Sequence, residues 1–322
     1  SDIRARFPQA RIDWVVEEGF ADIPRLHPAV GRVIPVAVRR WRRNPFSAIT
    51  WCELRAYRTA VRAERYDLVL DTQGLIKSAL LARQAAGPRA GYAAEAAREP
   101  LAARFYDATY VIPKNLHAVE RNRWLAAAAL GYEPNLPLDY GIAAAPLAAP
   151  WLPAQPYCVL LTASSRADKL WPETDWLQLA AALNAHGLAC VLPGGSFDER
   201  ARAARLAAGM AQAVAAPQMG IAELAQLLAG ARLVVGVDTG LSHIAAALGR
   251  LTFCLFAGSH PELTGVYAGE TAINLGGVGA PPTVEQVIGA VEDHVGRASA
   301  RHWPSIDCCC RAEARPTGRP AE

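Results

Sequence analysis

Residues 234–243, V-V-G-V-D-T-G-L-S-H, decide the fold class of this chain. With Leu233 in front, the apolar part is a short, mostly β-branched run that suits a central parallel strand. The polar turn at residues 238–240 follows, and the Ala-rich stretch 241–248 predicts a helix. A buried strand, a tight turn and a helix in this order form the repeating unit of an α/β fold with a parallel sheet.

The turn in this stretch is a candidate ligand site. Ligands of α/β sheets bind beyond the carboxyl ends of strands, and free N–H groups at a helix start favour anions such as a diphosphate. Gly240 lets the backbone approach a ligand, and Asp238 can accept hydrogen bonds from sugar hydroxyls. His243 lies one turn into the predicted helix and is expected to face the same ligand site. An ordinary N-cap with a surface histidine explains the stretch about equally well, because short motifs match by chance.

The composition is that of a globular chain. A length of 322 residues allows two domains, and 52% hydrophobic with 20% charged residues excludes a disordered protein. No apolar run reaches the length of a membrane span, and no secretory signal opens the chain, so we expect neither a transmembrane nor a secreted protein.

Single cysteines stand mostly in apolar runs, which predicts buried thiols in a reducing compartment. They are Cys52, Cys158, Cys190 and Cys254. The adjacent cysteines 308–310 lie in a Pro-rich tail, and no Cys or His spacing there supports a metal site. We expect residues 298–322 to be a disordered tail.

The positive charge of the chain lies in its N-terminal half. Residues 1–150 carry 21 Lys and Arg against 15 Asp and Glu, whereas residues 151–322 carry 12 against 15. The N-terminal half is therefore the expected place for an anionic partner. Four guanidinium groups surround Trp41 in R-R-W-R-R: Arg39, Arg40, Arg42 and Arg43.

This R-R-W-R-R cluster allows several interpretations. Each guanidinium can bind a phosphate or a carboxylate through two hydrogen bonds. A charge run is usually a solvated loop, and a nucleic-acid groove needs basic and aromatic residues to recur, which they do not. An anionic membrane surface fits better, because Trp prefers the interface and clustered Arg prefers anionic headgroups.

Strand and helix candidates alternate on both sides of an Ala/Pro linker at residues 143–153. Before the linker, strands are predicted at 12–16, 32–36, 68–70 and 109–112, and helices at 48–65 and 118–130. After it, strands are predicted at 157–161, 189–192, 211–215, 233–237 and 252–256, and helices at 176–186, 199–208, 221–229 and 241–248. The alternation predicts an α/β protein of two doubly wound, Rossmann-like domains, residues 1–146 and 151–297, facing across a cleft.

Further polar stretches follow predicted strands of the C-terminal half and suit one nucleotide-sugar ligand. Residues 162–169 offer the hydroxyls of Ser164 and Ser165 and the ammonium of Lys169 to a diphosphate, without a metal. Beyond a Gly-Gly turn, Glu199 is placed to bind a ribose diol, and Met219 offers a thioether for a base. Taken singly, a Gly-Gly turn is usually only a turn, and Met219 is more often a core residue.

A set of motifs runs through the chain in a fixed order. They are W-V-V-E-E-G-F (14–20), R-R-W-R-R (39–43), D-T-Q-G-L-I-K-S-A (71–79), R-E-P-L-A (98–102), H-A-V-E-R (117–121), T-A-S-S-R-A-D-K-L-W (162–171) and V-D-T-G-L-S-H (237–243). In this order they make the chain resemble the lipopolysaccharide heptosyltransferases of glycosyltransferase family 9, over about residues 1–296.

The resemblance implies a two-domain GT-B fold and a specific reaction. Members transfer L-glycero-D-manno-heptose from ADP-heptose to the first Kdo sugar of Kdo2-lipid A, inverting the anomeric centre without a metal or other cofactor. The resemblance also implies a place at the cytoplasmic face of the inner membrane.

The resemblance assigns roles to residues of both halves. On the donor side, it implies that the diphosphate is bound by Ser164, Ser165 and Lys169. Near the adenosine it places Glu199 and Met219. The diphosphate and the heptose are also contacted by Asp238, Thr239, Gly240 and His243. Lys169 would also stabilise departing ADP. On the acceptor, it implies that Arg39, Arg40, Arg42 and Arg43 meet the lipid A phosphates and that Gln73, Lys77 and Arg98 lie near the Kdo carboxylate.

The chain departs from the family pattern at its start. Family members begin with a strand and a Gly-containing loop whose Asp is the general base. Residues 1–8 resemble the end of the helix after that loop, so the resemblance implies that roughly 20 residues are absent. Asp2 does not replace the base, because no strand and glycine turn precede it. A lost general base typically costs about 10²–10⁴-fold in rate, and loss of a central strand exposes the edges of its neighbours.

Alternative functions therefore stay open beside transfer to Kdo. A sister heptosyltransferase would use a heptose acceptor, although the R-R-W-R-R cluster favours the acceptor nearer the lipid. A catalytically impaired binding protein would bind ADP or a nucleotide sugar without turnover.

Overall fold

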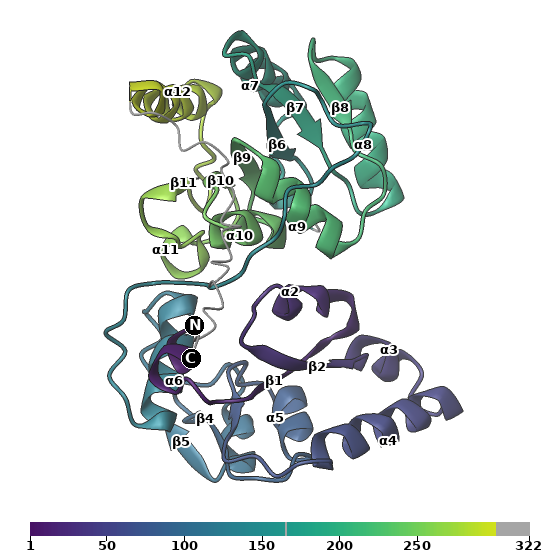
Figure 1. The fold of residues 1–322 in the computed structure, drawn as a ribbon, viewed down its shortest axis with the longest axis vertical. Helices are drawn as coiled ribbons and strands as arrows, with labels where there is room; N and C mark the ends of the chain where they lie inside the picture. Colours follow the sequence, from purple (N-terminus) through teal and green to yellow (C-terminus); the bar gives the residue numbers. More distant parts are fainter. Residues whose placement is uncertain (165, 301–322) are drawn as a thin grey trace, which may run out of the picture.

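The computed structural model describes residues 1–164 and 166–300, which fold into two α/β halves (Figure 1). The connection between them, residues 131–156, contains no helix or strand. Part of it packs on the C-terminal half, where Leu147 and Trp151 contact the core and the Leu147 N–H donates to the Gln226 carbonyl (3.1 Å). Parallel sheets with helices between the strands confirm the predicted α/β class.

The C-terminal half contains a six-stranded sheet in which every pairing is parallel. Its order is β11 (Ala272–Gly276), β10 (Leu251–Phe256), β9 (Leu233–Val237), β6 (Tyr157–Leu161), β7 (Ala189–Leu192) and β8 (Ala213–Ala215). The chain starts at β6, winds outward through β7 and β8, and then crosses to β9 on the other side. The winding direction thus reverses between β6 and β9.

Helices cover both faces of this sheet. On one face lie α7 (Glu173–Ala185), α8 (Phe197–Ala208) and α12 (Val284–Ala300), and on the other lie α9 (Ile221–Gly230) and α10 (Gly240–Ala247). Alternate residues of β6 serve the two faces, since Leu160 packs in the first core and Val159 in the second. All residues of β6 and β9 are buried, as expected for central parallel strands.

The N-terminal half contains two smaller parallel sheets. One pairs β1 (Ile12–Glu17) with β2 (Val30–Val36), and the other has the order β3 (Val69–Asp71), β4 (Arg89–Tyr92), β5 (Ala108–Tyr110). The helices of this half are α1 (Asp2–Arg6), α2 (Asp22–Arg25), α3 (Val38–Arg43), α4 (Ala48–Arg62), α5 (Ile76–Ala82) and α6 (Ala118–Leu130). The remaining short helices are η1 (Glu18–Phe20), η2 (Pro100–Phe105), η3 (Ala167–Lys169), α11 (Pro261–Thr264) and η4 (Gly269–Thr271).

The split between the two N-terminal sheets falls between β1 and β3. Within the described residues each of these strands pairs on one side only, and Trp14 and Val15 of β1 are 49% and 37% exposed. A side-chain hydrogen bond links β1 to the segment before β3, where the Tyr66 hydroxyl donates to Asp13 (2.7 Å). Both strands thus have one edge that is unpaired within the described residues.

Most predicted elements agree with the structure, and the differences are local. Strands β4 and β11 and helices α5 and α12 escaped prediction, as did the short helices α2, α3 and α11. Of the four single cysteines, Cys52 is exposed rather than buried, because it lies on the solvent face of α4. Helix α12 extends to Ala300, and the rest of the predicted tail, with its cysteines 308–310, lies outside the described residues. No described helix combines the length and the apolar composition needed to cross a bilayer.

Gly236 of β9 is expected to be essential for packing. A Cβ there would lie 2.6 Å from Ser242 Oγ and 2.8 Å from Leu161 Cβ. Gly236→Ala should therefore lower the free energy of unfolding by about 1–3 kcal/mol, measured by urea denaturation. Gly240→Ala is the matched control, because a Cβ at Gly240 meets nothing within 4 Å. Equal stability of the two variants would contradict this account of the β6–β9–α10 packing.

Candidate functional site

The candidate site lies where the C-terminal sheet reverses its winding. The loop after β6 and the loop after β9 emerge side by side there, because these strands are hydrogen-bonded neighbours with the same direction. Ligands of open α/β sheets bind at such a switch point, beyond the carboxyl ends of the strands. The predicted residues 162–169 and 238–243 are in these two loops and the helix that follows.

The Asp238 carboxylate is the centre of a polar cluster at this edge. The Lys169 ammonium donates to Oδ2 of Asp238 (2.6 Å), and the Ser259 hydroxyl donates to the same oxygen (2.5 Å). His243 Nε2 lies 3.8 Å from the other oxygen, Oδ1. The side chains of Asp238 and Lys169 are only 11% and 17% exposed, whereas His243 is 41% exposed. Three strand-end loops and one helix thus meet on a single carboxylate.

The electrostatics of the cluster favour the ionised carboxylate. Burial by itself raises the pKa of Asp238, but the contacts with His243, Lys169 and Ser259 outweigh it and hold the pKa well below its usual range. Asp238 is therefore an anion at neutral pH, paired with a cation from another loop.

The start of α10 provides open backbone beside the cluster. Thr239 is the N-cap residue, and the structure gives its side chain no capping hydrogen bond. Gly240 is exposed, with free space where a Cβ would be. Ser242, in contrast, is fully buried and donates to the Val237 carbonyl (2.9 Å), which fixes the helix to the strand. The N–H groups of the first helical turn are thus available to an anion.

The loop after β6 contacts the same cluster through Lys169. Ser164 is half-buried, and its hydroxyl accepts from the Arg166 N–H (3.5 Å). Ser165 lies outside the described residues. Thr162 is 1% exposed, and its hydroxyl has no hydrogen-bond partner within the described chain. The loop therefore brings a cation and hydroxyl groups to the edge where α10 begins.

The structure gives Glu199 and Met219 local roles. One carboxylate oxygen of Glu199 accepts from the N–H groups of Gly195 (2.8 Å) and Ser196 (3.0 Å) in a capping box that begins α8. Met219 is half-buried and packs against the core between the sheet and α9. Both stand after outer strands of the same sheet. The contacts of these two residues with adenosine stay a prediction.

In the N-terminal half, the structure brings the D-T-Q-G and R-E-P motifs together. The Glu99 N–H donates to the Gly74 carbonyl (3.0 Å), and the Ile76 N–H donates to the Glu99 carboxylate (2.7 Å). Buried Asp71 organises the loop by accepting hydrogen bonds from the Gln73 N–H, the Ser78 hydroxyl and the Tyr106 hydroxyl. Three exposed side chains of these motifs have no partner within the described residues: Gln73, Lys77 and Arg98.

The R-R-W-R-R cluster forms helix α3, and its members differ in environment. Arg40 donates to the carboxylates of Glu18 (2.9 Å) and Glu53 (2.9 Å), so a phosphate would have to compete with two acids. Trp41 is 7% exposed and donates to Glu53 (2.6 Å). The expectation that this indole lies in a membrane interface is therefore wrong, because it is part of the core between β2 and α4.

The other arginines of the cluster face solvent. The Arg39 guanidinium lies 5.7 Å from the centre of the Phe20 ring, whereas Arg42 and Arg43 are exposed and have no side-chain partner among the described residues. Arg42 and Arg43 are thus the members best able to bind an anion.

The two halves touch next to the Asp238 cluster. His117, the N-cap of α6, stacks on Tyr267 (4.4 Å between ring centres), and its Nε2 lies 3.1 Å from the Gly265 carbonyl oxygen. Burial lowers the pKa of His117, and the nearby His243 lowers it further. The N-terminal half therefore faces the cluster.

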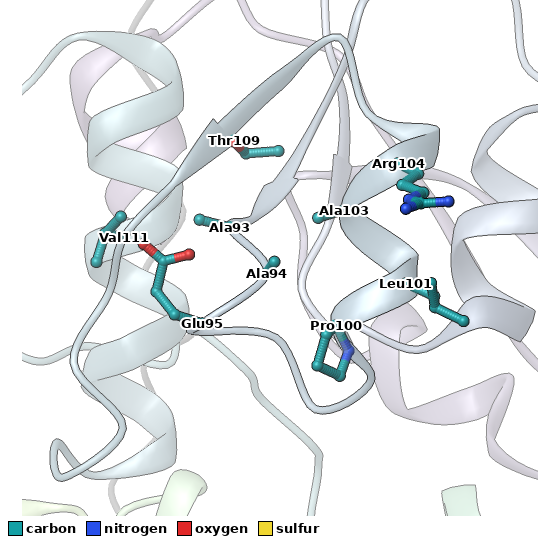
Figure 2. A pocket seen from close by; sticks show the side chains of 9 residues that line it. All are labelled: Ala93, Ala94, Glu95, Pro100, Leu101, Ala103, Arg104, Thr109 and Val111. Atoms are coloured by element: carbon teal, nitrogen blue, oxygen red, sulfur yellow. The ribbon is translucent and has the colours of Figure 1, made fainter.

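The sequence did not point to Ser259, which completes the cluster. The sequence pattern around Ser259 gives little indication of a site, since a Gly-Ser pair after a buried strand is common in turns. A hollow of about 580 Å³ in the N-terminal half, between the chain after β4 and helix η2, is lined by none of the predicted site residues (Figure 2). We assign it no role.

Comparison with known proteins identifies the family. The model of glycosyltransferase family 9 (heptosyltransferase) matches residues 54–290. Lipopolysaccharide heptosyltransferase 1 of Salmonella typhimurium is 48% identical over 269 residues, which is 83% of this chain and 85% of the relative. The chain belongs to glycosyltransferase family 9. It is accordingly a glycosyltransferase, and the predicted resemblance is confirmed.

Solved structures agree with this family 9 assignment. The E. coli heptosyltransferase WaaC with ADP is 43% identical, with a TM-score of 0.83 and 92% of both chains covered. The E. coli ADP-heptose lps heptosyltransferase II is 22% identical, with a TM-score of 0.70 over 92% of this chain and 93% of that one, and it shows the shared fold alone. These matches confirm the predicted GT-B arrangement.

The Asp238 cluster predicts a pH-dependent stability. Because the pKa of folded Asp238 lies below that of an unfolded aspartate, about 3.9, its ionised form stabilises the fold above roughly pH 4. This contribution is lost as the pH falls through the folded-state pKa. Asp238→Asn should lower the free energy of unfolding by about 1–3 kcal/mol at pH 6, and the difference from the parent should shrink by pH 3.

Urea denaturation at both pH values measures this effect. Glu270→Gln is the control, because Glu270 is exposed and has no side-chain partner in the described chain. A difference for Asp238→Asn that stays constant from pH 6 to pH 3 would be incompatible with the ion-pair account.

Proposed function

We propose that this family 9 enzyme transfers L-glycero-D-manno-heptose from ADP-heptose to the first Kdo sugar of Kdo2-lipid A. The observation that carries the proposal is the cluster of Lys169, Asp238 and Ser259 beside the start of α10, at the switch point of the C-terminal sheet. This edge offers a cation and free N–H groups to a diphosphate and a carboxylate to sugar hydroxyls. The identity to relatives named lipopolysaccharide heptosyltransferase 1 supports heptose as the sugar and lipopolysaccharide synthesis as the setting.

On the donor side, we assign the diphosphate to Lys169, Ser164, Ser165 and the first turn of α10. The side chains of Asp238 and His243, with Thr239 and Gly240, would bind the heptose and the sugar-proximal phosphate. Glu199 and Met219 would lie toward the adenosine. The Glu199 oxygen that does not cap α8 is the one left for a ribose hydroxyl.

The proposed reaction is a direct displacement at the anomeric carbon. The acceptor hydroxyl attacks that carbon from the face opposite the diphosphate, the bond from the carbon to the diphosphate oxygen breaks, and the configuration inverts. The Lys169 ammonium would neutralise the charge that develops on departing ADP, the role that a metal ion plays in other transferases. A base must take the hydroxyl proton, and we assign none within the described residues.

On the acceptor side, Gln73, Lys77 and Arg98 are proposed to bind the Kdo carboxylate. Their motifs are in backbone contact, and Lys77 and Arg98 supply two unpaired cations at one place. Arg39, Arg42 and Arg43 would meet the lipid A phosphates, with a smaller contribution from Arg40. Because this acceptor is a lipid, we also propose that the enzyme works at the cytoplasmic face of the inner membrane, on an anionic surface.

Heptose transfer from ADP-heptose to Kdo2-lipid A, followed by mass spectrometry of the lipid, tests the proposal. The assay is done on this chain and on a form that carries a family-type strand and Asp loop before Ser1. Transfer by either form supports the proposal, and transfer by the second alone assigns the base to the added loop. Transfer to a heptose-bearing acceptor in preference to Kdo2-lipid A would favour the sister enzyme. ADP binding without transfer by either form would favour a binding protein.

Lys169→Ala should lower kcat by about 10²–10³-fold, since one electrostatic stabiliser of the leaving group is removed, and should weaken ADP binding. Steady-state transfer rates and calorimetric titration with ADP measure the two effects. The matched control is Lys114→Ala, an exposed lysine outside the proposed site. Unchanged kcat in Lys169→Ala would overturn the assignment of Lys169 to the diphosphate.

Replacing Arg42 and Arg43 together by Ala should raise KM for Kdo2-lipid A about tenfold or more, because two charge-assisted hydrogen bonds to phosphate are lost. KM for ADP-heptose should stay unchanged. Arg83→Ala with Arg104→Ala serves as the control, since both are exposed and lie outside the proposed site. An unchanged acceptor KM would mean that the exposed end of α3 is only a solvated surface.

A further inference from the structure

The H-A-V-E-R motif at residues 117–121 lies where the two halves of the molecule meet. It forms the N-cap and the first turn of α6, and α11 of the C-terminal half packs beside this helix (Figure 1). His117 contacts the C-terminal half, whereas Arg121, one turn further along α6, contacts the segment after β4. One short motif thus has partners on both sides of the boundary between the halves.

Both ring nitrogens of His117 have a hydrogen-bond partner. Nδ1 accepts from the Val119 N–H (3.2 Å) and so caps α6. The neutral ring must then carry its proton on Nε2, and this N–H donates to the Gly265 carbonyl of the C-terminal half (3.1 Å). The ring also stacks on Tyr267, with 4.4 Å between the ring centres. A single tautomer of His117 therefore begins α6 and bonds to the opposite half.

The segment that this ring contacts is held in place by the C-terminal half. It belongs to the connection between β10 and β11. Asn274 of β11 donates to the Val266 carbonyl and accepts from the Val266 N–H (both 2.9 Å), and Val266 is buried. The same connection carries Ser259, whose hydroxyl donates to Asp238. A contact with this segment is thus a contact with the backbone that completes the donor cluster.

Arg121 connects α6 to the acceptor motifs in the other direction. Its guanidinium donates to the Ala96 carbonyl (2.6 Å) and lies over the Tyr92 ring, 4.8 Å from the ring centre. Ala96 stands two residues before Arg98, which is one of the cations proposed for the Kdo carboxylate. The start of α6 therefore has one link toward the donor cluster and one toward the acceptor cations.

We propose that His117 is a positioning residue for heptose transfer. Through Gly265 and Tyr267 it holds the acceptor cations of the N-terminal half in register with the Asp238 cluster of the C-terminal half. The inference rests on the proposed function, in which two substrates are held on different halves. Reacting atoms must approach to about 3–3.5 Å, and a misplacement of about 1 Å can lower the rate about 100-fold. His117 need not touch a reacting atom, since it acts by aligning the halves.

The contact depends on the charge of the His117 ring. Burial lowers the pKa of His117 and His243 on α10 lowers it further, whereas the hydrogen bond to the other half and the Glu120 carboxylate oppose them. Two tyrosine hydroxyls are also near: that of Tyr267 and that of Tyr140, which donates to the Tyr267 carbonyl (2.5 Å). The ring is therefore neutral at pH 7.5. Protonation would put an N–H in place of the capping acceptor and a cation at the positive end of α6, so acid should weaken the contact.

His117→Asn tests the inference, because asparagine keeps the N-cap but is too short to reach the Gly265 carbonyl. Transfer is measured on this chain, or on the form with the added Asp loop if that form alone is active. At pH 7.5, kcat should fall about 10–100-fold. Calorimetric titration should give an unchanged Kd for ADP, since the proposed donor groups all lie in the C-terminal half. His186→Asn is the matched control, an exposed histidine at the amino edge of the C-terminal sheet, and should transfer like the parent.

The pH dependence and a second variant separate positioning from a general loss of structure. From pH 7.5 to pH 5, the deficit of His117→Asn should shrink, because the parent loses the same contact as His117 becomes charged. Tyr267→Leu removes the stacked ring and should lower kcat about two- to tenfold. Combining it with His117→Asn should add little, because both changes act on one contact. Deficits that multiply, or a deficit that is the same at both pH values, would overturn the inference.

The outcomes distinguish this inference from the proposed function. Equal kcat for the parent and His117→Asn would overturn the inference and leave the proposed function standing. A weaker ADP affinity in His117→Asn would also overturn it and assign His117 a structural role. If neither form of the parent transfers heptose, the proposed function fails, and nitrogen NMR of the histidine rings still tests the contact. The signal that is lost in His117→Asn should report a neutral ring protonated on Nε2 at pH 7.5, and a proton on Nδ1 would overturn the contact itself.

Discussion

A partly buried carboxylate must be neutralised where it lies, and in this enzyme that requirement organises the C-terminal half around Asp238. Its oxygens contact Lys169, Ser259 and His243, which come from the loop after β6, the loop after β10 and helix α10. Removing any one partner leaves a charge in a site with little solvent. Three loops that are far apart in sequence are thus fixed relative to one another before any ligand arrives. The absence of a side chain at Gly236 supports the arrangement, because it allows α10 to approach β9.

The groups of such a cluster can exchange hydrogen-bond partners when a ligand binds. An ammonium group has three donors, so Lys169 can remain near Asp238 while it donates to a diphosphate oxygen. Under the proposed function, the carboxylate would then have capacity for sugar hydroxyls, and the positive end of α10 would share the phosphate charge. The ion pair would therefore keep Lys169 in place for the donor substrate. Substrate and Asp238 would compete for the hydrogen bonds of its ammonium group. Since His117 of the N-terminal half contacts Tyr267 and Gly265 of the C-terminal half, the sugar would meet the acceptor where the halves face each other.

The sequence predicted those parts of the structure in which local pattern and tertiary packing agree. The run from β9 to α10 combines a β-branched strand, a polar turn and an Ala-rich helix, and the structure has all three in place. Strand β4 escaped prediction because Arg-Ala-Gly-Tyr has no β-branched residue. Its Gly91 is required instead by the ring of Tyr106, which a Cβ would approach to 2.3 Å. Ser259 escaped for a similar reason, because only the parallel pairing of β9 with β10 brings it to Asp238.

Charge is the property that sequence alone describes least well in this protein. R-R-W-R-R looks uniform, yet Arg40 and Trp41 are both bound to Glu53, which lies 13 and 12 residues further along the chain. No local pattern distinguishes them from Arg42 and Arg43, since the difference depends on how α4 packs against α3. Once the paired groups are set aside, exposed cations of the N-terminal half gather in two of the motif regions, beside single ones elsewhere such as Arg83, Arg104 and Lys114. One is the loop pair that carries Lys77 and Arg98, and the other is the outer surface of α3 and α4. Under the proposed function, the first place would bind the carboxylate of the acceptor sugar and the exposed end of α3 would bind the phosphates of its lipid. A single net charge cannot separate these two kinds of site.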